Sequence, residues 1–363
     1  MKPGYFFIWM FMLWMTACTL DAVEENPGGD ELTEETDPND DSDGDGTVDE
    51  EENDSDDEEK EKDEDELNGG EGTIFIAGHE VAKESVLRTI PKEYIDKARE
   101  SFHVAYQHTS HGTHVSRGIF GLTDYKSGDD DLFGVSLNKR VSGKLTFYDY
   151  ALEDYAASGN TATDLSVDET AFIQATRNFL DDPDNAHVNV VMWSWCDISK
   201  HKVAENYLPG MEQLISEYGF DGSKIGTGSG QREKPVHFIF MTGHAVFGNN
   251  VGDGRPESQA DIINKYCEEN KVFCLDYYSI DSHDMDGNYW NDASDDGYSD
   301  LYGGNFYKDW QESHSLGTDY WENRKEPGGS VVYGAHNTQH ITANRKAMAF
   351  WWILARLAGW DGE

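Results

Sequence analysis

The stretch VNVVMWSWCDIS at residues 188–199 decides the fold class of this chain. It begins with an apolar run and ends in polar residues, which predicts a buried strand that feeds a loop. Working outward, we expect further strands at residues 102–107, 141–150, 236–241 and 272–275, and helices at 93–100, 168–180, 204–218, 256–269 and 342–357. Such alternation is typical of a mainly parallel sheet with helices on both faces, a three-layer α/β/α sandwich.

The last of these helices, residues 342–357, is apolar on most sides, so we expect it to be buried and to pack across the sheet. Thr342 is a suitable N-cap for it. Residues 222–234 and 276–329 show no periodicity and are rich in Gly, Asp, Tyr and Trp. Their aromatic content favours ordered loops near a site.

The first 72 residues differ from the rest in composition. Residues 1–18 have a lysine at position 2 and a short apolar run, as a secretory signal does. Their ending MTAC resembles a bacterial lipobox, with Cys18 as the lipidated residue. Residues 19–72 predict a disordered acidic tether, since residues 21–72 hold 27 acidic residues and two lysines. Residues 73–363 are then the folded domain, in an exported protein anchored to a membrane at the outer membrane or cell surface.

The charge and two motifs limit the partners and cofactors. A net charge of −43 argues against nucleic acid as a partner. Within the tether, four acidic residues fit the spacing of a calcium loop: Asp41, Asp43, Asp45 and Glu52. Chance matches to this spacing are common in so acidic a segment. Among the other cysteines, Cys267 and Cys274 could form a disulfide or remain separate thiols, and Cys196 has no obvious partner.

Four polar segments follow strands or open helices, in the order YQHTSHG (106–112), ASGNTATDL (157–165), MWSWCDIS (192–199) and HNTQHITANRKA (336–347). Parallel sheets carry their active-site loops at the carboxyl ends of the strands. Ser110 lies directly after the first strand, where its hydroxyl would project from the sheet edge. A serine becomes a nucleophile only with a base and an oxyanion-stabilising group nearby.

This ordered set resembles the SGNH/GDSL hydrolase superfamily over about residues 102–360. The resemblance implies a flavodoxin-like α/β/α domain in which Ser110 is the nucleophile, Gly159 lends its N–H to the oxyanion hole and His340 is the base. The third block, usually Gly-x-Asn-Asp, agrees only at Asp197, and Cys196 replaces the oxyanion-hole asparagine. In the fourth block Asn337 replaces the aspartate, and an amide cannot stabilise an imidazolium as a carboxylate does.

Other polar residues complete the predicted cleft. His336 is an alternative to His340 as the base. His111, Trp195 and His244 are candidates for substrate binding. The rings of Trp193, Trp195 and Trp290 could stack on sugars. The first segment and the residues just after it contain three histidines, His108, His111 and His114. Together with His244 they could bind zinc, or they could form hydrogen bonds around the cleft.

The sequence therefore predicts a surface-anchored serine esterase that acts on acyl esters, acetyl esters above all, of carbohydrate or related extracellular substrates, with no required cofactor. Two alternatives remain open. One is a glycan-binding lipoprotein that has lost catalysis on the same fold, and the other is a metal-dependent enzyme acting on polysaccharide.

Overall fold

A computed structural model describes residues 74–156 and 164–362, and everything stated about the structure concerns those residues. Seven parallel strands form one sheet in the order β1-β7-β6-β5-β2-β4-β3. Their bounds are β1 Ile76–Ala77, β2 His103–Gln107, β3 Val135–Leu137, β4 Leu145–Asp149, β5 Val190–Trp193, β6 His237–Met241 and β7 Cys274–Leu275. This confirms the predicted mainly parallel α/β architecture, and the inner order β4-β2-β5-β6-β7 is the flavodoxin-like one.

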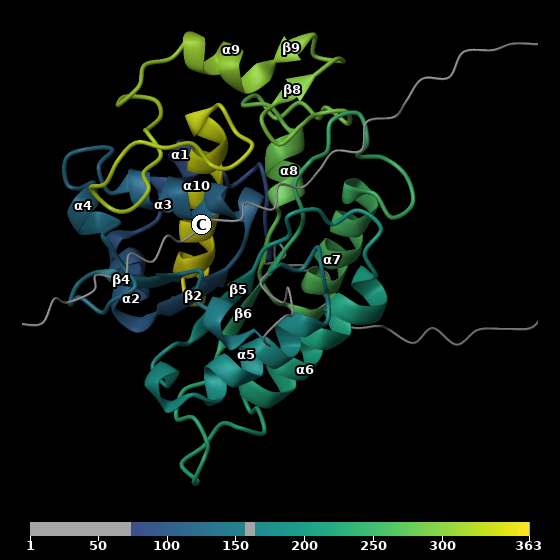
Figure 1. The fold of residues 1–363 in the computed structure, drawn as a ribbon. Helices are drawn as coiled ribbons and strands as arrows, with labels where there is room; N and C mark the ends of the chain where they lie inside the picture. The colour runs from purple at the N-terminus through teal and green to yellow at the C-terminus, as the bar shows by residue number, and fades with distance from the viewer. Residues whose placement is uncertain (1–73, 157–163, 363) are drawn as a thin grey trace, which may run out of the picture. The chain divides into compact units, whose positions relative to one another are not determined.

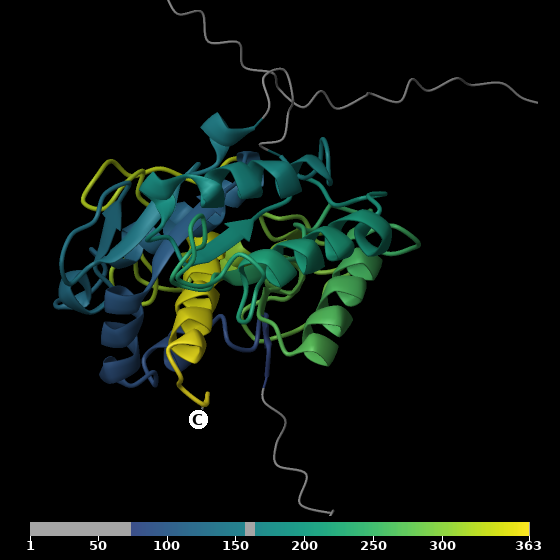
Figure 2. The same ribbon diagram turned by 90° about the horizontal axis from the view of Figure 1, so that it is seen from below.

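Helices cover both faces of the sheet (Figures 1 and 2). One face carries α1 Glu84–Leu87, α2 Lys92–Ser101, α3 Thr113–Leu122 and α10 His340–Leu357. The other carries α5 Ala171–Asp181, α6 Leu208–Tyr218 and α7 Pro256–Asn270. Short elements fill the connections: α4 Asp129–Leu132, α8 Tyr277–Ser282, α9 Phe306–Glu312, the antiparallel pair β8 Tyr298–Ser299 and β9 Gly304–Asn305, the 3-10 turns η1 Ser110–Gly112, η2 Glu153–Tyr155 and η3 Pro183–Asn185, and a π-helical turn η4 Val203–Tyr207.

The apolar runs of the central strands are continuous because these strands face a core on both sides. Along β5, Val190 and Met192 belong to the core beneath α2, α3 and α10, whereas Val191 and Trp193 belong to the core beneath α5 and α6. This two-residue alternation is what a strand buried on both faces requires. Among the described residues, none of the helices combines the length and apolarity needed to cross a bilayer.

The closing helix α10 confirms the expectation of a buried helix, with a different start. It begins at His340, and Gln339 is its N-cap, so the prediction of Thr342 as N-cap is wrong. Thr342 lies inside the first turn, where its hydroxyl donates to the carbonyl of Gln339. The helix packs against α3 at very short range, since a Cβ on Gly118 of α3 would collide with the carbonyl of Ala343.

Candidate active site

The site lies where the carboxyl ends of β2, β5 and β6 meet, at the strand-order reversal where open α/β sheets bind ligands. Ser110 and His111 follow β2, Cys196 follows β5, and His244 follows β6. Two later segments complete the site. Asp295 comes from the connection between α8 and α9, and His336 comes from the loop before α10.

Ser110 opens η1, which continues directly into α3, and its side chain is partly exposed. The turn is tightly fixed. The Tyr277 hydroxyl donates to the carbonyl of His111 (2.8 Å), and the Thr113 hydroxyl donates to the carbonyl of Ser110 (2.7 Å). Gly112 is required here, because a Cβ would overlap both His108 and Ser194. A strand that ends in a helix start places Ser110 at the N-terminal end of η1 and α3.

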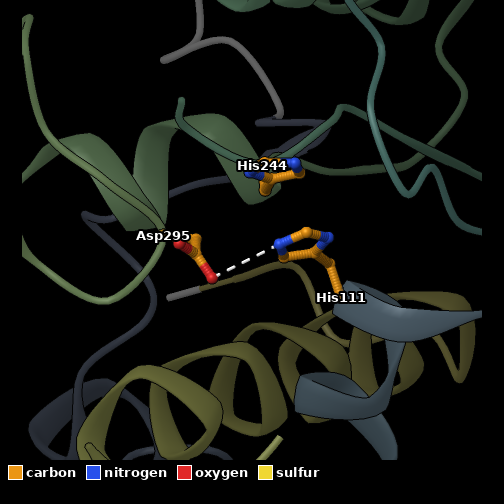
Figure 3. A group of neighbouring side chains, drawn as sticks. All are labelled: His111, His244 and Asp295. Atoms are coloured by element: carbon orange, nitrogen blue, oxygen red, sulfur yellow. Dashed lines mark ion pairs between the residues drawn. The ribbon is translucent and has the colours of Figure 1, made fainter. Parts of the chain in front are cut away.

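Three imidazoles stack at this edge. The ring of His111 lies 3.7 Å from that of His244, nearly parallel at 13°, and 4.7 Å from that of His336. Asp295 approaches the same ring, with its Oδ2 3.5 Å from His111 Nε2 (Figure 3). On the opposite side of the ring, Cys196 Sγ lies 3.6 Å from His111 Nδ1. The structure thus brings together His111 and His244, as the sequence predicted, with His336.

Burial controls the charge of this cluster. It lowers the pKa of His111, with a further contribution from the neighbouring His244, and it lowers the pKa of His244 as well. Burial also raises the pKa of Asp295 well above its usual range, and the carboxylate of Asp281 adds to that increase. Burial therefore favours the neutral forms of His111 and His244, each of which keeps a ring lone pair that can accept a proton or bind an ion.

A buried polar layer supports the cluster from below. Lys346 of α10 donates to Asp281 Oδ1 (2.5 Å), and both side chains are fully buried. The same ammonium lies 3.4 Å from His114 Nδ1 and 4.0 Å from the centre of the Tyr277 ring. His114 Nε2 donates to the carbonyl of Ala335 (2.7 Å), so its Nδ1 is the acceptor that faces Lys346.

The loop that carries His336 is held on both sides. Ala335 N–H donates to Thr113 Oγ1 (2.8 Å), and Ala335 carbonyl accepts from His114. Two residues after His336, the backbone N–H of Thr338 donates to Asp296 Oδ1 (2.8 Å). His336 itself has a left-handed backbone (φ 61°) and an exposed side chain. Positive φ in a residue other than glycine is often found at functional positions.

His340 is placed elsewhere. Its Nδ1 accepts from the backbone N–H of Asn323 (3.2 Å), its ring stacks on Tyr333 at 4.4 Å, and burial lowers its pKa. Nor does the structure bring Asn337 to His340, as the fourth block implied. The Asn337 amide instead faces His114 Nδ1 (3.4 Å) and bonds to Thr342. Within the described residues, no hydrogen bond joins the Ser110 hydroxyl to an imidazole, although such bonds often tighten only when substrate binds.

The third block contributes less than the sequence suggested. Trp193 and Trp195 are buried, and Trp195 Nε1 donates to the carbonyl of Met241 (3.2 Å), so neither ring is available to stack on a sugar. Asp197 is exposed, and its Oδ1 accepts from the N–H of Ser199 (2.8 Å), as in a local turn. Cys196, Cys267 and Cys274 are buried, and none of them forms a disulfide within the described residues. Of the two alternatives for Cys267 and Cys274, the structure contains two separate thiols and no disulfide between them.

Several predicted residues lie outside the described part of the chain. These are the oxyanion-hole candidate Gly159, the lipidation candidate Cys18, and the calcium-loop candidates Asp41, Asp43, Asp45 and Glu52.

Sequence reasoning missed three residues of the site: Asp281, Asp295 and Lys346. Asp295 lies in an acidic, aperiodic segment that matches no catalytic motif, so only its membership of a long ordered loop pointed toward the site. Lys346 did carry a signal, since a lysine in a helix predicted to be buried needs a buried partner.

No family model, no curated protein and no solved structure matches this chain.

Proposed function

We propose that this protein is a serine esterase whose nucleophile is Ser110 and whose general base is His336. One observation carries the proposal: Ser110 begins a helix at the end of β2, beside the strand-order reversal, with a stack of imidazoles at the same edge. The flavodoxin-like strand order supports the resemblance to SGNH/GDSL hydrolases, since their four motifs follow the corresponding strands.

The chemistry follows that of other serine hydrolases. Ser110 Oγ attacks the ester carbonyl carbon while the imidazole of His336 takes its proton, and the imidazolium then protonates the departing alcohol. Water next attacks the acyl-enzyme with His336 again as the base, which releases the carboxylic acid and restores Ser110. Backbone N–H groups at the start of η1 are suited to stabilise the oxyanion.

His336 is preferred to His340 because of its surroundings. A base must have a free nitrogen that can reach the serine. The ring of His336 is exposed beside His111, whereas His340 is buried with its Nδ1 engaged by Asn323.

The substrate class is an acyl ester of carbohydrate, acetyl esters included. Support comes from the loop that carries Asp295, which displays aromatic side chains to solvent. Tyr298 packs edge-on against Phe247 at 5.1 Å, and Tyr302 against Trp290 at 5.5 Å. Tyr298, Phe247 and Tyr302 are all exposed, and aromatic rings of this kind can stack on sugars. They take over the role that the sequence assigned to Trp193 and Trp195.

The localisation proposal rests on the sequence alone. We propose that the protein is exported and anchored through a lipid on Cys18. Metabolic labelling with a fatty-acid analogue is expected to mark the wild type and to leave Cys18→Ser unmarked. Equal labelling of the two would contradict the anchor.

Kinetics on aryl acetate and acetylated sugars test the esterase proposal. Ser110→Ala is expected to lower kcat/KM by at least about 1000-fold, because an alanine cannot form the acyl-enzyme. Ser216→Ala is the matched control, since Ser216 lies on α6 and only bonds to the carbonyl of Gln213. His336→Ala should lose much more activity than His340→Ala. Hydrolysis by Ser110→Ala at the wild-type rate would refute the proposal.

A further inference from the structure

His111, His244 and Asp295 form a compact group of three potential metal ligands. One ligand atom from each lies within 4.8 Å of the others. They come from three separate segments, namely η1, the turn after β6 and the long loop before β8. Figure 3 shows the carboxylate of Asp295 directed at the His111 ring, with the His244 ring beside it. Imidazole nitrogens with a carboxylate oxygen are a donor set found at zinc sites.

The hydrogen bond of His244 to the backbone leaves its Nε2 as the nitrogen that could bind a metal ion. Its Nδ1 donates to the carbonyl of Ala245 (2.7 Å), so the lone pair of the neutral ring is on Nε2. Histidines that bind metals almost always donate their second ring N–H in this way, which fixes the ring and its tautomer.

Asp295 has a side-chain oxygen without a close partner. Its Oδ2 is buried and accepts no hydrogen bond in the described part of the chain. His111 Nε2 lies 3.5 Å away, which is too far for a good hydrogen bond. The buried ammonium of Lys346 is bonded to Asp281 instead. A cation bound beside Asp295 would give this buried oxygen a partner.

We propose that His111, His244 and Asp295 bind one divalent transition-metal ion, of which zinc fits best, and leave a fourth position open to solvent or substrate. Tetrahedral ligands at zinc distances lie about 3.4 Å apart, close to the 3.5 Å between His111 Nε2 and Asp295 Oδ2. The rings of His111 and His244 are stacked nearly parallel (13°), so one of them must rotate for both nitrogen lone pairs to point at the same ion. Calcium and magnesium prefer oxygen ligands, so two imidazoles argue against them.

The metal also offers an answer to an anomaly of the site, and this step rests on the proposed esterase function. Cys196, a weak donor, replaces the asparagine of the oxyanion hole, and it lies beside His111. An ion held by His111 would stand at the same edge as Ser110 and could polarise the ester carbonyl as a Lewis acid.

Zinc binding to the full-length chain tests the proposal. After chelator treatment and dialysis, the protein is titrated with Zn²⁺ by calorimetry, and with Co²⁺ while its visible absorption is recorded. We expect one tight equivalent in the wild type and a tetrahedral Co²⁺ spectrum. Asp295→Asn and His244→Ala should weaken that equivalent by more than the roughly 10- to 100-fold that loss of an outer-sphere partner costs.

Asp300→Asn is the matched control, because Asp300 is an exposed carboxylate of the same loop. The acidic N-terminal residues add weak sites equally to every variant, so they cancel in the comparison. If Asp295→Asn, folded by circular dichroism, binds Zn²⁺ as tightly as the wild type does, the metal proposal is overturned.

Ser110→Ala separates this proposal from the esterase. Tight binding of Zn²⁺ with hydrolysis abolished supports both proposals. Tight binding with hydrolysis retained supports the metal site and overturns the serine nucleophile.

Discussion

The two halves of α10 are almost equally buried but differ in chemistry. Residues 347–357 are mainly apolar and pack into the core with the helices on that face of the sheet. Residues 340–346 include Asn344, Arg345 and Lys346, each with no exposed surface. Burying such groups costs free energy unless each finds a partner. The second half therefore stabilises the fold, while the first half performs a task that apolar residues could not.

That task is to hold segments that have little regular structure of their own. Arg345 donates to the carbonyls of Ile280 (3.0 Å) and His283 (2.5 Å). Asn344 donates to the carbonyl of Trp321 (3.1 Å), and Lys346 bonds to Asp281. Through these contacts the first half of α10 fixes the loops that carry Asp295 and His336. Buried polar residues in this helix therefore mark the part that supports the site, whereas buried apolar residues mark the part that fills the core.

The largest expected effect comes from breaking the buried ion pair. Lys346→Met leaves Asp281 without its cation and should lower the free energy of unfolding by about 3–5 kcal/mol. Urea unfolding followed by tryptophan fluorescence measures it. The double variant Lys346→Met/Asp281→Leu should recover most of the stability, since an apolar pair can replace a buried ion pair. Its hydrolysis should stay impaired, and full recovery of activity would contradict a role for the pair in the site.

A truncation in the second half should act on stability alone. Leu354→Ala removes a fully buried side chain from the core and should cost about 3 kcal/mol. Under conditions where the variant is folded, kcat and KM per folded molecule should match those of the wild type. A selective loss of kcat would show that the two halves of α10 are not separable.

The pH dependence of stability tests the buried polar layer beside the first half of α10, because His114 of α3 lies 3.4 Å from Lys346. Burial lowers the pKa of His114 well below its usual value, so the unfolded chain binds a proton that the folded chain does not. Stability from this group is present above about pH 6.5 and is lost as the pH falls below it. His114→Gln should reduce that acid-induced slope by up to about 1.4 kcal/mol per pH unit below pH 6. Urea unfolding at a series of pH values measures the slope, and an unchanged slope would argue that His114 titrates normally.

The smallest expected effect is the most selective control. Ile353→Val deletes one methylene from a fully buried side chain in the second half and should cost about 1 kcal/mol. Activity at 25 °C should not change. A loss of hydrolysis comparable to that of Lys346→Met would contradict the division of the helix.

Much of the fold could be predicted from the sequence, because hydrophobic periodicity reports burial directly. The predicted strand at 236–241 and the helix at 256–269 match β6 and α7 within one residue at each end. The helix α3 was missed because Gly118 and Gly121 lower its helical propensity. Both glycines are needed for close packing, Gly118 against α10 and Gly121 against the backbone of Glu322. Tertiary packing decided this element, and no local pattern reports it.

The site could be predicted only where it follows strands. Ser110, His111 and His244 come directly after β2 and β6, so strand prediction located them. Asp295 and His336 come from irregular loops, whose positions depend on buried partners far away in sequence, such as Lys346 for the first loop and His114 for the second. Motif matching favoured His340, but the geometry of the α10 start turns that residue toward Asn323 and Tyr333.

Covalent labelling tests the central claim most directly. The protein is treated with a fluorophosphonate, digested and analysed by mass spectrometry, with Ser110→Ala as the control. We expect one adduct, on the Ser110 hydroxyl, that is absent from Ser110→Ala and forms more slowly in His336→Ala. An adduct on another residue, or an unlabelled Ser110 in folded protein that still hydrolyses esters, would contradict it.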